Sequence, residues 1–195
     1  MSEIVLIHSV LGVRPGVLSA ARRLRAAGHT VHVPDLYGGK VFDDYAEADQ
    51  FVQGFGSYPE LLRRTAEAVS GLGTDLVYAG FSNGAGGAAY LAATRPGARA
   101  AVLMNGTLPM SLIGSITGSA PTWPSTVPVQ AHYGRDDPKR IEAWTREFAE
   151  DVRGAKHEFW EYPVASHLFA DESLPDEYDQ AAAELMWQRV LSFLD

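Results

Sequence analysis

A serine in a glycine-rich segment is the first residue whose setting suggests chemistry. The segment GFSNG, residues 80–84, matches the G-x-S-x-G pattern, in which a serine sits on a sharp turn from a strand into a helix. An apolar run (75–80) precedes it and a segment of small residues (83–95) follows it, as that pattern requires. Side chains at positions 80 and 84 would collide with the neighbouring strand and helix. The segment therefore predicts Ser82 as a nucleophile, with a glycine-rich structural turn as the alternative.

A serine hydroxyl becomes an effective nucleophile when a base takes its proton and a carboxylate orients that base. For the strand–turn–helix pattern the expected chain order is serine, acid and histidine, with each partner following a later strand. Asp137, directly before Pro138, and His167 satisfy both conditions. They are therefore predicted as the acid and the base. Asp136 is the rival acid, and capping of the following helix is the alternative role for either aspartate.

Five other histidines compete for the role of base. His29, His32 and His157 lie at or near the starts of expected strands, far from the carboxyl edge of a sheet. His132 lies within an expected strand, which favours a core or supporting position, whereas His8 ends the first strand and is placed to line the site. No pair of histidines has the spacing of metal ligands. Neither a metal nor another cofactor is expected.

The backbone after Ser82 supplies a second chemical element. The N–H of Asn83 opens the following helix, whose positive end suits an oxyanion that develops during attack on a carbonyl group. A dinucleotide-binding loop fits the same glycines less well, because their spacing is G-x-x-x-G-x-G-G and they do not follow the first strand. The pattern therefore favours a nucleophile over a phosphate cradle.

The elements that must position these residues alternate between strands and helices. Apolar runs predict six strands, at 3–8, 30–34, 75–80, 99–105, 128–134 and 156–163. Helical periodicity predicts five helices, at 15–27, 57–73, 83–95, 138–152 and 176–194. The pattern weakens over 36–56, and the proline- and glycine-containing segment 106–127 resembles a long loop.

This alternation predicts an α/β fold with an open, mostly parallel sheet and helices on both faces, because parallel strands are joined by right-handed crossovers. A closed eightfold barrel needs about 250 residues, more than this chain has. In an open sheet of this kind, ligands bind at the carboxyl ends of the strands. The residues predicted to do chemistry all follow strands, so we expect them at that edge.

Length and composition limit the kinds of protein that the chain can be. Its 195 residues are the length of one domain, covering 1–195. The absence of cysteine excludes disulfides and thiolate nucleophiles, and the formal net charge of -8 disfavours nucleic-acid binding. The N-terminal segment lacks a basic region, and its apolar run is too short for a secretory or membrane segment. No membrane partner is expected, and the cytoplasm is the default location.

Several segments of the chain carry a resemblance to a known family. Along nearly all of its length the chain resembles dienelactone hydrolase-type members of the α/β-hydrolase superfamily. The resemblance implies an α/β-hydrolase fold, Asp137 rather than Asp136 as the acid, and the backbone N–H of Val10 beside that of Asn83 as the second oxyanion donor. The segments that carry it are VLIHSVLGV (5–13), PDLYGG (34–39), GFSNGAG (80–86), HYGRDDP (132–138) and YPVASHLF (162–169).

The chain also departs from the pattern of the founding members of that family. Those enzymes have cysteine where this chain has Ser82, glutamate at the position of Ser9 and arginine at the position of Asp171. Their second substrate-binding arginine belongs to a region of this chain, 41–62, that holds no Lys or Arg. An acidic substrate would meet Asp171 and the acidic segment 43–49, so the sequence favours a neutral ester.

Together these residues predict a serine hydrolase that cleaves small carboxylic esters or lactones in an open cleft, because the chain leaves no room for a cap domain. A thioesterase or small peptidase on the same residues is one rival, and a non-catalytic binding protein is another. Ser9, Tyr37 and Trp123 are predicted to contact the substrate, since they lie in segments at the active edge. Ordinary loop packing is the alternative for the loop residues, which also include Met110, Leu112 and Ile113.

Overall fold

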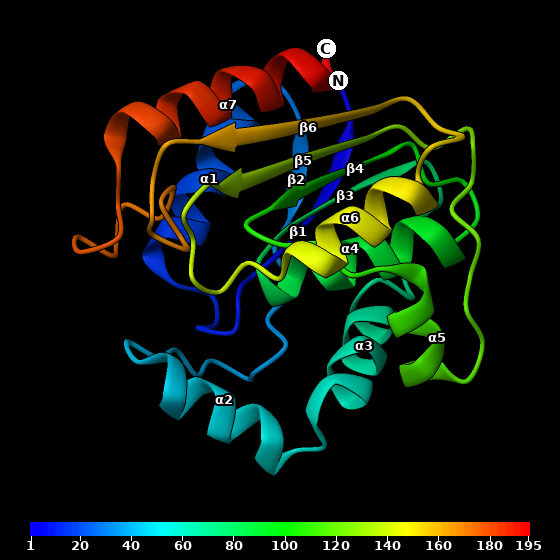
Figure 1. The fold of residues 1–195 in the computed structure, drawn as a ribbon, viewed down its shortest axis with the longest axis horizontal. Helices are drawn as coiled ribbons and strands as arrows, with labels where there is room; N and C mark the ends of the chain where they lie inside the picture. The colour runs from blue at the N-terminus through cyan, green and yellow to red at the C-terminus, as the bar shows by residue number, and fades with distance from the viewer.

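A six-stranded parallel sheet forms the centre of the molecule (Figure 1). The computed structural model describes residues 1–195, and the strand order is β2-β1-β3-β4-β5-β6. After β1, the chain adds β2 on one side of it. The remaining strands are then added in order on the other side, so β1 is flanked by β2 and β3. An open α/β sheet is therefore confirmed. The strands are β1 (Glu3–Ile7), β2 (Thr30–His32), β3 (Leu76–Phe81), β4 (Ala100–Met104), β5 (Val129–Gly134) and β6 (His157–Tyr162).

The chain has seven helices, and both faces of the sheet carry helices as expected, whereas α2 packs against α3. In Figure 1, α1 and α7 lie on one face, while α3, α4, α5 and α6 lie on the other. The Arg23–Glu184 ion pair joins α1 to α7 with an N–O distance of 2.5 Å. None of the helices combines the length and apolar character needed to cross a lipid bilayer. The helices are α1 (Pro15–Ala26), α2 (Tyr45–Gly54), α3 (Ser57–Ala68), α4 (Asn83–Thr94), α5 (Met110–Thr117), α6 (Glu142–Asp151) and α7 (Gln180–Leu194).

Two helices lie where the sequence predicted none. The prediction of a long loop at 106–127 is wrong for its first part, because α5 occupies it. The first turn of α5 is fixed from a distant part of the chain, since the Met110 N–H donates to Asp151 Oδ2 at 2.8 Å. In α2 the stabilising contact is local: the Asp44 side chain accepts a hydrogen bond from the Glu47 N–H at 2.9 Å and caps the helix.

Several predicted helix ends also shift. The helix predicted at 57–73 ends at Ala68, and Gly56 is its N-cap. The last helix begins at Gln180, because the Asp179 side chain caps it by accepting from the Ala182 N–H. A side-chain cap thus sets the start of the last helix, which periodicity alone does not locate.

The helix α4 makes the closest approach to the sheet. It packs on β3, β4 and β1, and eight of its residues, all small except Leu91, are buried. Its small side chains let its axis lie near the strands, and the strand facing it, β3, is buried at every position. This packing fixes the segment between β3 and α4, where Ser82 lies.

His132 lies in β5 with its ring buried on the face that α7 covers. Its Nε2–H donates to Gln130 Oε1 at 2.9 Å, and the Tyr162 hydroxyl donates to its Nδ1 at 2.9 Å. Burial, with a smaller contribution from the positive charge of Arg189, lowers the pKa of His132 to about 3. The ring is therefore neutral in the folded protein, and the predicted core position of His132 is confirmed.

The buried His132 makes the protein sensitive to acid. Because its pKa is about 3 in the folded protein and about 6.5 when unfolded, the unfolded chain takes up the proton first as the pH falls below 6.5. Stability is thus lost from that pH downward, by about 2 kcal/mol at pH 5 from this residue. Urea unfolding at pH 7 and pH 5 measures the loss. His132→Gln removes the titrating group and is expected to reduce the difference between the two pH values; an unreduced difference would contradict the assignment.

Candidate active site

Ser82 occupies the turn between β3 and α4 in a conformation that few side chains adopt. Its φ is 52° and its ψ is -115°, and such strain persists only where surrounding structure holds it. The surrounding structure here is backbone. A Cβ on Gly80 would lie 2.1 Å from Gly84 O, and one on Gly84 would lie 2.4 Å from His8 O. The collision expected of side chains at 80 and 84 is confirmed. Because both positions are glycine, the turn can be tight enough to project the Ser82 side chain.

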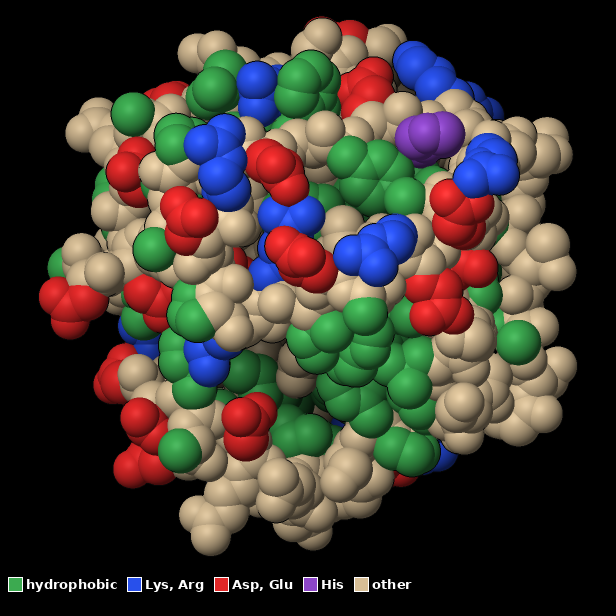
Figure 2. Space-filling model, viewed as in Figure 1, with side chains coloured by type: hydrophobic (Ala, Val, Ile, Leu, Met, Phe, Trp, Pro, Cys, Tyr) green, Lys and Arg blue, Asp and Glu red, His purple; other side chains and the backbone are tan.

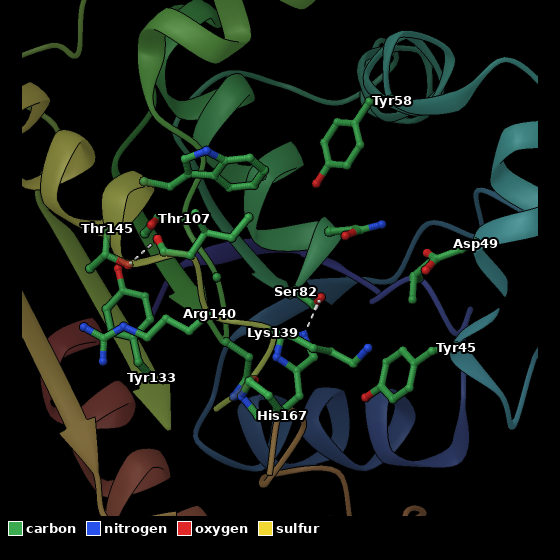
Figure 3. Close-up of a pocket in the computed structure, with 18 residues that line it drawn as sticks. Tyr45, Asp49, Tyr58, Ser82, Thr107, Tyr133, Lys139, Arg140, Thr145 and His167 are labelled. Carbon is green, nitrogen blue, oxygen red and sulfur yellow. Dashed lines mark hydrogen bonds between the residues drawn. The ribbon is translucent and has the colours of Figure 1, made fainter. Parts of the chain in front are cut away.

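Three side chains that follow separate strands form one hydrogen-bonded chain. His167 Nε2 accepts from the Ser82 hydroxyl at 2.7 Å, a bond drawn in Figure 3. His167 Nδ1–H donates to Asp137 Oδ2 at 2.6 Å. The second oxygen of the Asp137 carboxylate accepts from the Lys139 N–H at 2.8 Å, which fixes the carboxylate plane. The structure therefore brings together Ser82, Asp137 and His167, as the sequence predicted. Asp136, the neighbour of Asp137, is exposed and makes no hydrogen bond to His167.

The loops that carry Asp137 and His167 meet because β5 and β6 are paired along their full length. Gly134 and Tyr162 are partners at the last position of the two strands. A Cβ on Gly134 would lie 3.0 Å from Val164 O and 3.1 Å from Ser166 O, closer than most side chains tolerate. The glycine thus lets the histidine-bearing loop fold back onto the end of β5.

The two residues predicted to supply oxyanion donors flank Ser82 in the same pocket. Val10 and Asn83 both line it, and the Val10 N–H donates to no acceptor within the protein. The loop after β1 is pressed against the start of α4, since a Cβ on Gly84 would also lie 2.5 Å from Ile7 O. This contact holds the β1 loop and the first turn of α4 beside each other, as a two-donor oxyanion site requires.

A pocket of ≈ 460 Å³ opens beside Ser82 and His167. In Figure 2 the surface is hollowed between the regions of α2 and α3, with hydrophobic side chains in the wall. Figure 3 shows two arms that diverge from Ser82, one towards the side chains of α2 and α3 and one towards β5 and α6. The lining residues are Val10, Tyr45, Asp49, Tyr58, Ser82, Asn83, Gly86, Asn105, Gly106, Thr107, Tyr133, Pro138, Lys139, Arg140, Ile141, Trp144, Thr145 and His167.

The three residues predicted to contact substrate do not line this pocket. Ser9 lies behind it, where its hydroxyl accepts a hydrogen bond from the Leu11 N–H at 3.2 Å. Tyr37 is buried among the rings of His8 and three phenylalanines, and Trp123 is buried with its Nε1–H donating to Val127 O at 2.9 Å. Both aromatic side chains therefore serve the core. The same holds for Met110 and Ile113, and Leu112 also lies outside the pocket.

The pocket residues that sequence reasoning missed lie in strands, helices and turns around the predicted loops. Tyr45 and Tyr58 come from α2 and α3, Tyr133 lies in β5, and Thr107 follows β4. In the sequence, these residues share one of two features: they lie near the carboxyl end of a strand, or they belong to the segment 36–58 beside the pocket. Either feature identifies a segment that can line the pocket, but not which side chains of that segment face it.

The remaining histidines are engaged elsewhere. Burial lowers the pKa of His8, whose Nδ1–H donates to Ser9 O at 2.6 Å while its Nε2 accepts from the Leu36 N–H at 3.1 Å. His8 supports the loops after β1 and β2 but does not reach the pocket. His29 and His32 contact residues at the start of β1, and His157 contacts Ala155 O. No group of three or more His, Asp or Glu side chains is arranged to hold a metal ion.

Asp171 does not face the pocket, contrary to the expectation that an acidic substrate would meet it. Its Oδ1 accepts from the N–H and the hydroxyl of Ser173, at 2.9 Å and 2.6 Å. The buried Arg14 guanidinium lies beside both residues and donates to Ser173 O at 3.1 Å and to Phe42 O at 2.6 Å. Asp171 thus has a structural role in the loop after His167. The charged side chains that line the pocket are Asp49, Lys139 and Arg140.

The loop after His167 is tied to α2 as well. Glu177 Oε2 accepts from the Leu168 N–H and Glu177 Oε1 accepts from the Tyr45 hydroxyl, each at 2.7 Å. The Tyr45 ring meets His167 edge-on with the ring centroids 6.1 Å apart. Burial and the Glu177 contact both raise the pKa of Tyr45, so its phenol stays protonated and holds this bond.

The comparisons with known proteins agree with this architecture. The model of the dienelactone hydrolase family matches residues 1–195. A search of curated proteins gave no match. Among solved structures, the chain is similar to a putative dienelactone hydrolase from Klebsiella pneumoniae subsp. pneumoniae MGH 78578, with a TM-score of 0.75 and 23% identity over 98% of this chain and 85% of that one.

Two further solved structures share the fold. One is P91, a dienelactone hydrolase-like promiscuous phosphotriesterase from metagenomic libraries, with a TM-score of 0.76 and 19% identity over 99% of this chain and 85% of that one. The other is the thermophilic esterase Est2 from the Planctomycetes species Thermogutta terrifontis, with a TM-score of 0.60 and 19% identity over 99% of this chain and 82% of that one. At these identities, the likeness establishes the α/β-hydrolase fold.

The tight turn at Ser82 predicts a large effect for a single methyl group. Gly84→Ala places a Cβ against two carbonyl oxygens of the β1 segment, and overpacking of this kind lowers the free energy of unfolding by roughly 1–3 kcal/mol. The matched control is Gly54→Ala at the end of α2, where a Cβ meets nothing within 4 Å. Urea unfolding of both variants measures the difference. Equal stability of the two variants would contradict the proposed role of backbone contact in the turn.

Proposed function

The chain belongs to the dienelactone hydrolase family, and from this premise we propose that it is a serine hydrolase that cleaves small carboxylic esters or lactones. The observation that carries the proposal is the continuous hydrogen-bonded path from the Ser82 hydroxyl through His167 to Asp137, with its hydroxyl end in the wall of the pocket. This arrangement supplies a nucleophile, a base and an orienting carboxylate in the order that acyl transfer needs.

The proposed reaction runs in two halves. In the first, His167 Nε2 takes the Ser82 proton as the oxygen attacks the ester carbonyl, and Asp137 stabilises the imidazolium. The N–H groups of Asn83 and Val10 bind the oxyanion, a contribution of about 3 kcal/mol per donor. The carbon–oxygen bond of the ester then breaks, the leaving alcohol takes the proton from His167, and an acyl-enzyme remains.

In the second half, water replaces the alcohol. His167 removes a proton from the water as it attacks the acyl carbonyl, and a second oxyanion forms in the same place. Collapse of this intermediate releases the carboxylic acid and returns the proton to Ser82. No redox change occurs and every proton is accounted for, so the chain's own residues suffice and no cofactor enters the scheme.

Several features of the pocket support a small and uncharged substrate. Its volume of ≈ 460 Å³ is in the range of small-molecule sites. Of the charged side chains that line it, Arg140 is already paired with Glu161 at 2.6 Å, and Lys139 lies over the Tyr45 ring with its Nζ 4.0 Å from the centroid. With Asp49 present as well, the pocket does not carry the concentrated positive charge that selects an anion.

Labelling with a fluorophosphonate, followed by mass analysis, tests the nucleophile. We expect one adduct, on Ser82, in the unmodified protein and none in Ser82→Ala or His167→Ala. Hydrolysis of a 4-nitrophenyl ester is expected to fall by roughly 10³- to 10⁶-fold in both variants. His157→Ala, which changes an exposed histidine far from the pocket, is the control and should retain the adduct. A folded protein that takes up no label would instead support a binding role.

Rates over matched ester, thioester and amide substrates separate the proposed esterase from the two other acyl chemistries. We expect the ester to be cleaved with a higher kcat/KM than the amide, because amide resonance makes the carbonyl less electrophilic and the leaving amine must take a proton from His167. The thiol of a thioester is a better leaving group than an alcohol, so the thioester is expected to gain no more than this higher intrinsic reactivity. A thioester preference beyond that reactivity, or an amide preference, would move the assignment to a thioesterase or peptidase on the same three side chains.

The two adjacent aspartates provide an internal comparison for the acid. Asp137→Asn removes the charge that orients His167, and kcat is expected to fall by about 10⁴-fold. Asp136→Asn makes the same chemical change at the exposed neighbour, which makes no hydrogen bond to His167, and should leave kcat within about 2-fold. Steady-state kinetics with one ester measures both. Comparable losses in the two variants would contradict the assignment of Asp137.

A further inference from the structure

We propose that one arm of the pocket binds an oxygen atom of the substrate other than those of the ester being cleaved, namely a neutral ether, hydroxyl or carbonyl oxygen that accepts hydrogen bonds. This polar arm consists of Asn105, Thr107, Tyr133, Arg140 and Thr145. The inference rests on the proposed hydrolase function and specifies the class of substrate that it takes.

The polar arm lies at the ends of neighbouring strands. Asn105 directly follows β4, Tyr133 lies in β5, and Thr145 lies in α6. Figure 3 places Thr107, Tyr133 and Thr145 together on one side of Ser82, whereas Tyr45, Asp49 and Tyr58 lie on the other. A substrate whose carbonyl carbon meets Ser82 therefore extends one of its two parts towards the polar arm.

Asn105 carries the strongest signal in this arm. Only 3% of its surface is exposed, yet neither its side-chain oxygen nor its side-chain nitrogen has a hydrogen-bond partner in the protein. Its φ of 63° is left-handed, a conformation in which asparagine commonly bonds to its own backbone. Here the backbone N–H is used for β-sheet pairing, donating to His132 O at 2.8 Å, while the side chain stays free. Backbone conformation alone therefore does not account for the free amide.

Neighbouring side chains of the polar arm also have buried polar atoms that lack a well-aligned hydrogen-bond partner. The Tyr133 hydroxyl contacts the hydroxyls of Thr107 and Thr145. By stricter geometry, however, Thr107 Oγ1, the Tyr133 hydroxyl and Arg140 Nε are all buried without a well-aligned hydrogen-bond partner. With the two atoms of Asn105, the polar arm holds five of the eight such side-chain atoms in the whole molecule. Each unpaired buried group costs roughly 1–3 kcal/mol. Their concentration in one wall of the pocket is explained if a ligand supplies the partners.

The chemistry of the arm selects a neutral acceptor. Burial raises the pKa of Tyr133, and its contacts with Thr107, Arg140 and Thr145 oppose that rise without cancelling it, so the phenol remains a protonated donor. The Arg140 guanidinium stacks over the Tyr133 ring at 4.7 Å and is already neutralised by Glu161. The free groups are thus hydroxyl and amide donors around a paired cation, which suits an uncharged oxygen better than a carboxylate.

The test uses pairs of esters that differ only by one oxygen in place of a methylene. On the acyl side the pair is 4-nitrophenyl methoxyacetate and 4-nitrophenyl butyrate; on the alcohol side it is 2-methoxyethyl butyrate and butyl butyrate. The measured quantity is the ratio of kcat/KM for the oxygen-containing ester to that of its partner. Inductive differences within a pair cancel when the ratio of a variant is compared with that of the unmodified protein.

Tyr133→Phe and Thr107→Val each remove one hydroxyl with little change in volume. We expect each to reduce the ratio by roughly 2- to 10-fold for one of the two pairs, and that pair identifies the part of the substrate that enters the polar arm. Tyr58→Phe makes the same hydroxyl deletion in the opposite arm and should leave this ratio unchanged, whatever its effect on the overall rate. A purely structural role of Tyr133 and Thr107 would lower both rates of a pair together.

Unchanged ratios for both pairs in both variants would overturn the proposal, as would an equal reduction in Tyr58→Phe. Fluorophosphonate labelling of Ser82 in the same protein samples separates this outcome from failure of the hydrolase function. A variant that takes up label is folded and has a working nucleophile, so its ratio reports on the polar arm alone. Absence of label in the unmodified protein would instead remove the proposed function on which the inference rests.

Discussion

The backbone-to-backbone contact between β3, the loop after β1 and the first turn of α4 is the constraint on which the site depends. No side chain fits at Gly80 or Gly84, so the backbone segments at the turn pack directly against one another. The turn holds Ser82 in its positive-φ conformation, and it holds Val10 beside Asn83. Small residues continue along α4 and keep that helix close to the sheet. One packing requirement thus sets both the direction of the serine hydroxyl and the position of the candidate oxyanion donors.

The sheet then acts as a common frame for residues that are far apart in the sequence. Ser82 follows β3, Asp137 follows β5 and His167 follows β6, and parallel pairing delivers all three to one edge. Because β4 lies between β3 and β5, its carboxyl end contributes Asn105 to the same pocket. The polar arm is therefore a direct result of strand order, and the same topology that assembles the hydrogen-bonded chain also decides which loop confronts the substrate.

Local patterns predicted the parts of the site that depend on local backbone. The turn around Ser82 has a fixed spacing of glycines, and Asp137 and His167 each lie a few residues beyond a clear strand, so the sequence identified all three. It did not identify the pocket wall. Tyr37 and Trp123 lie in loops, as many substrate-contacting residues do, but their rings pack in aromatic clusters of the core against Phe51 and Phe148. A loop has no regular periodicity, so its sequence does not show which side chains face inward.

Two hydrogen bonds of Glu177 connect the histidine-bearing loop to α2. One carboxylate oxygen anchors the Leu168 N–H, next to His167, and the other anchors the Tyr45 hydroxyl at the start of α2. If the bond to Tyr45 were broken, the Glu177 carboxylate would be free to rotate, and its bond to the Leu168 N–H would weaken. Glu177 therefore couples the position of α2, which lines the pocket through Tyr45, to the loop that orients His167.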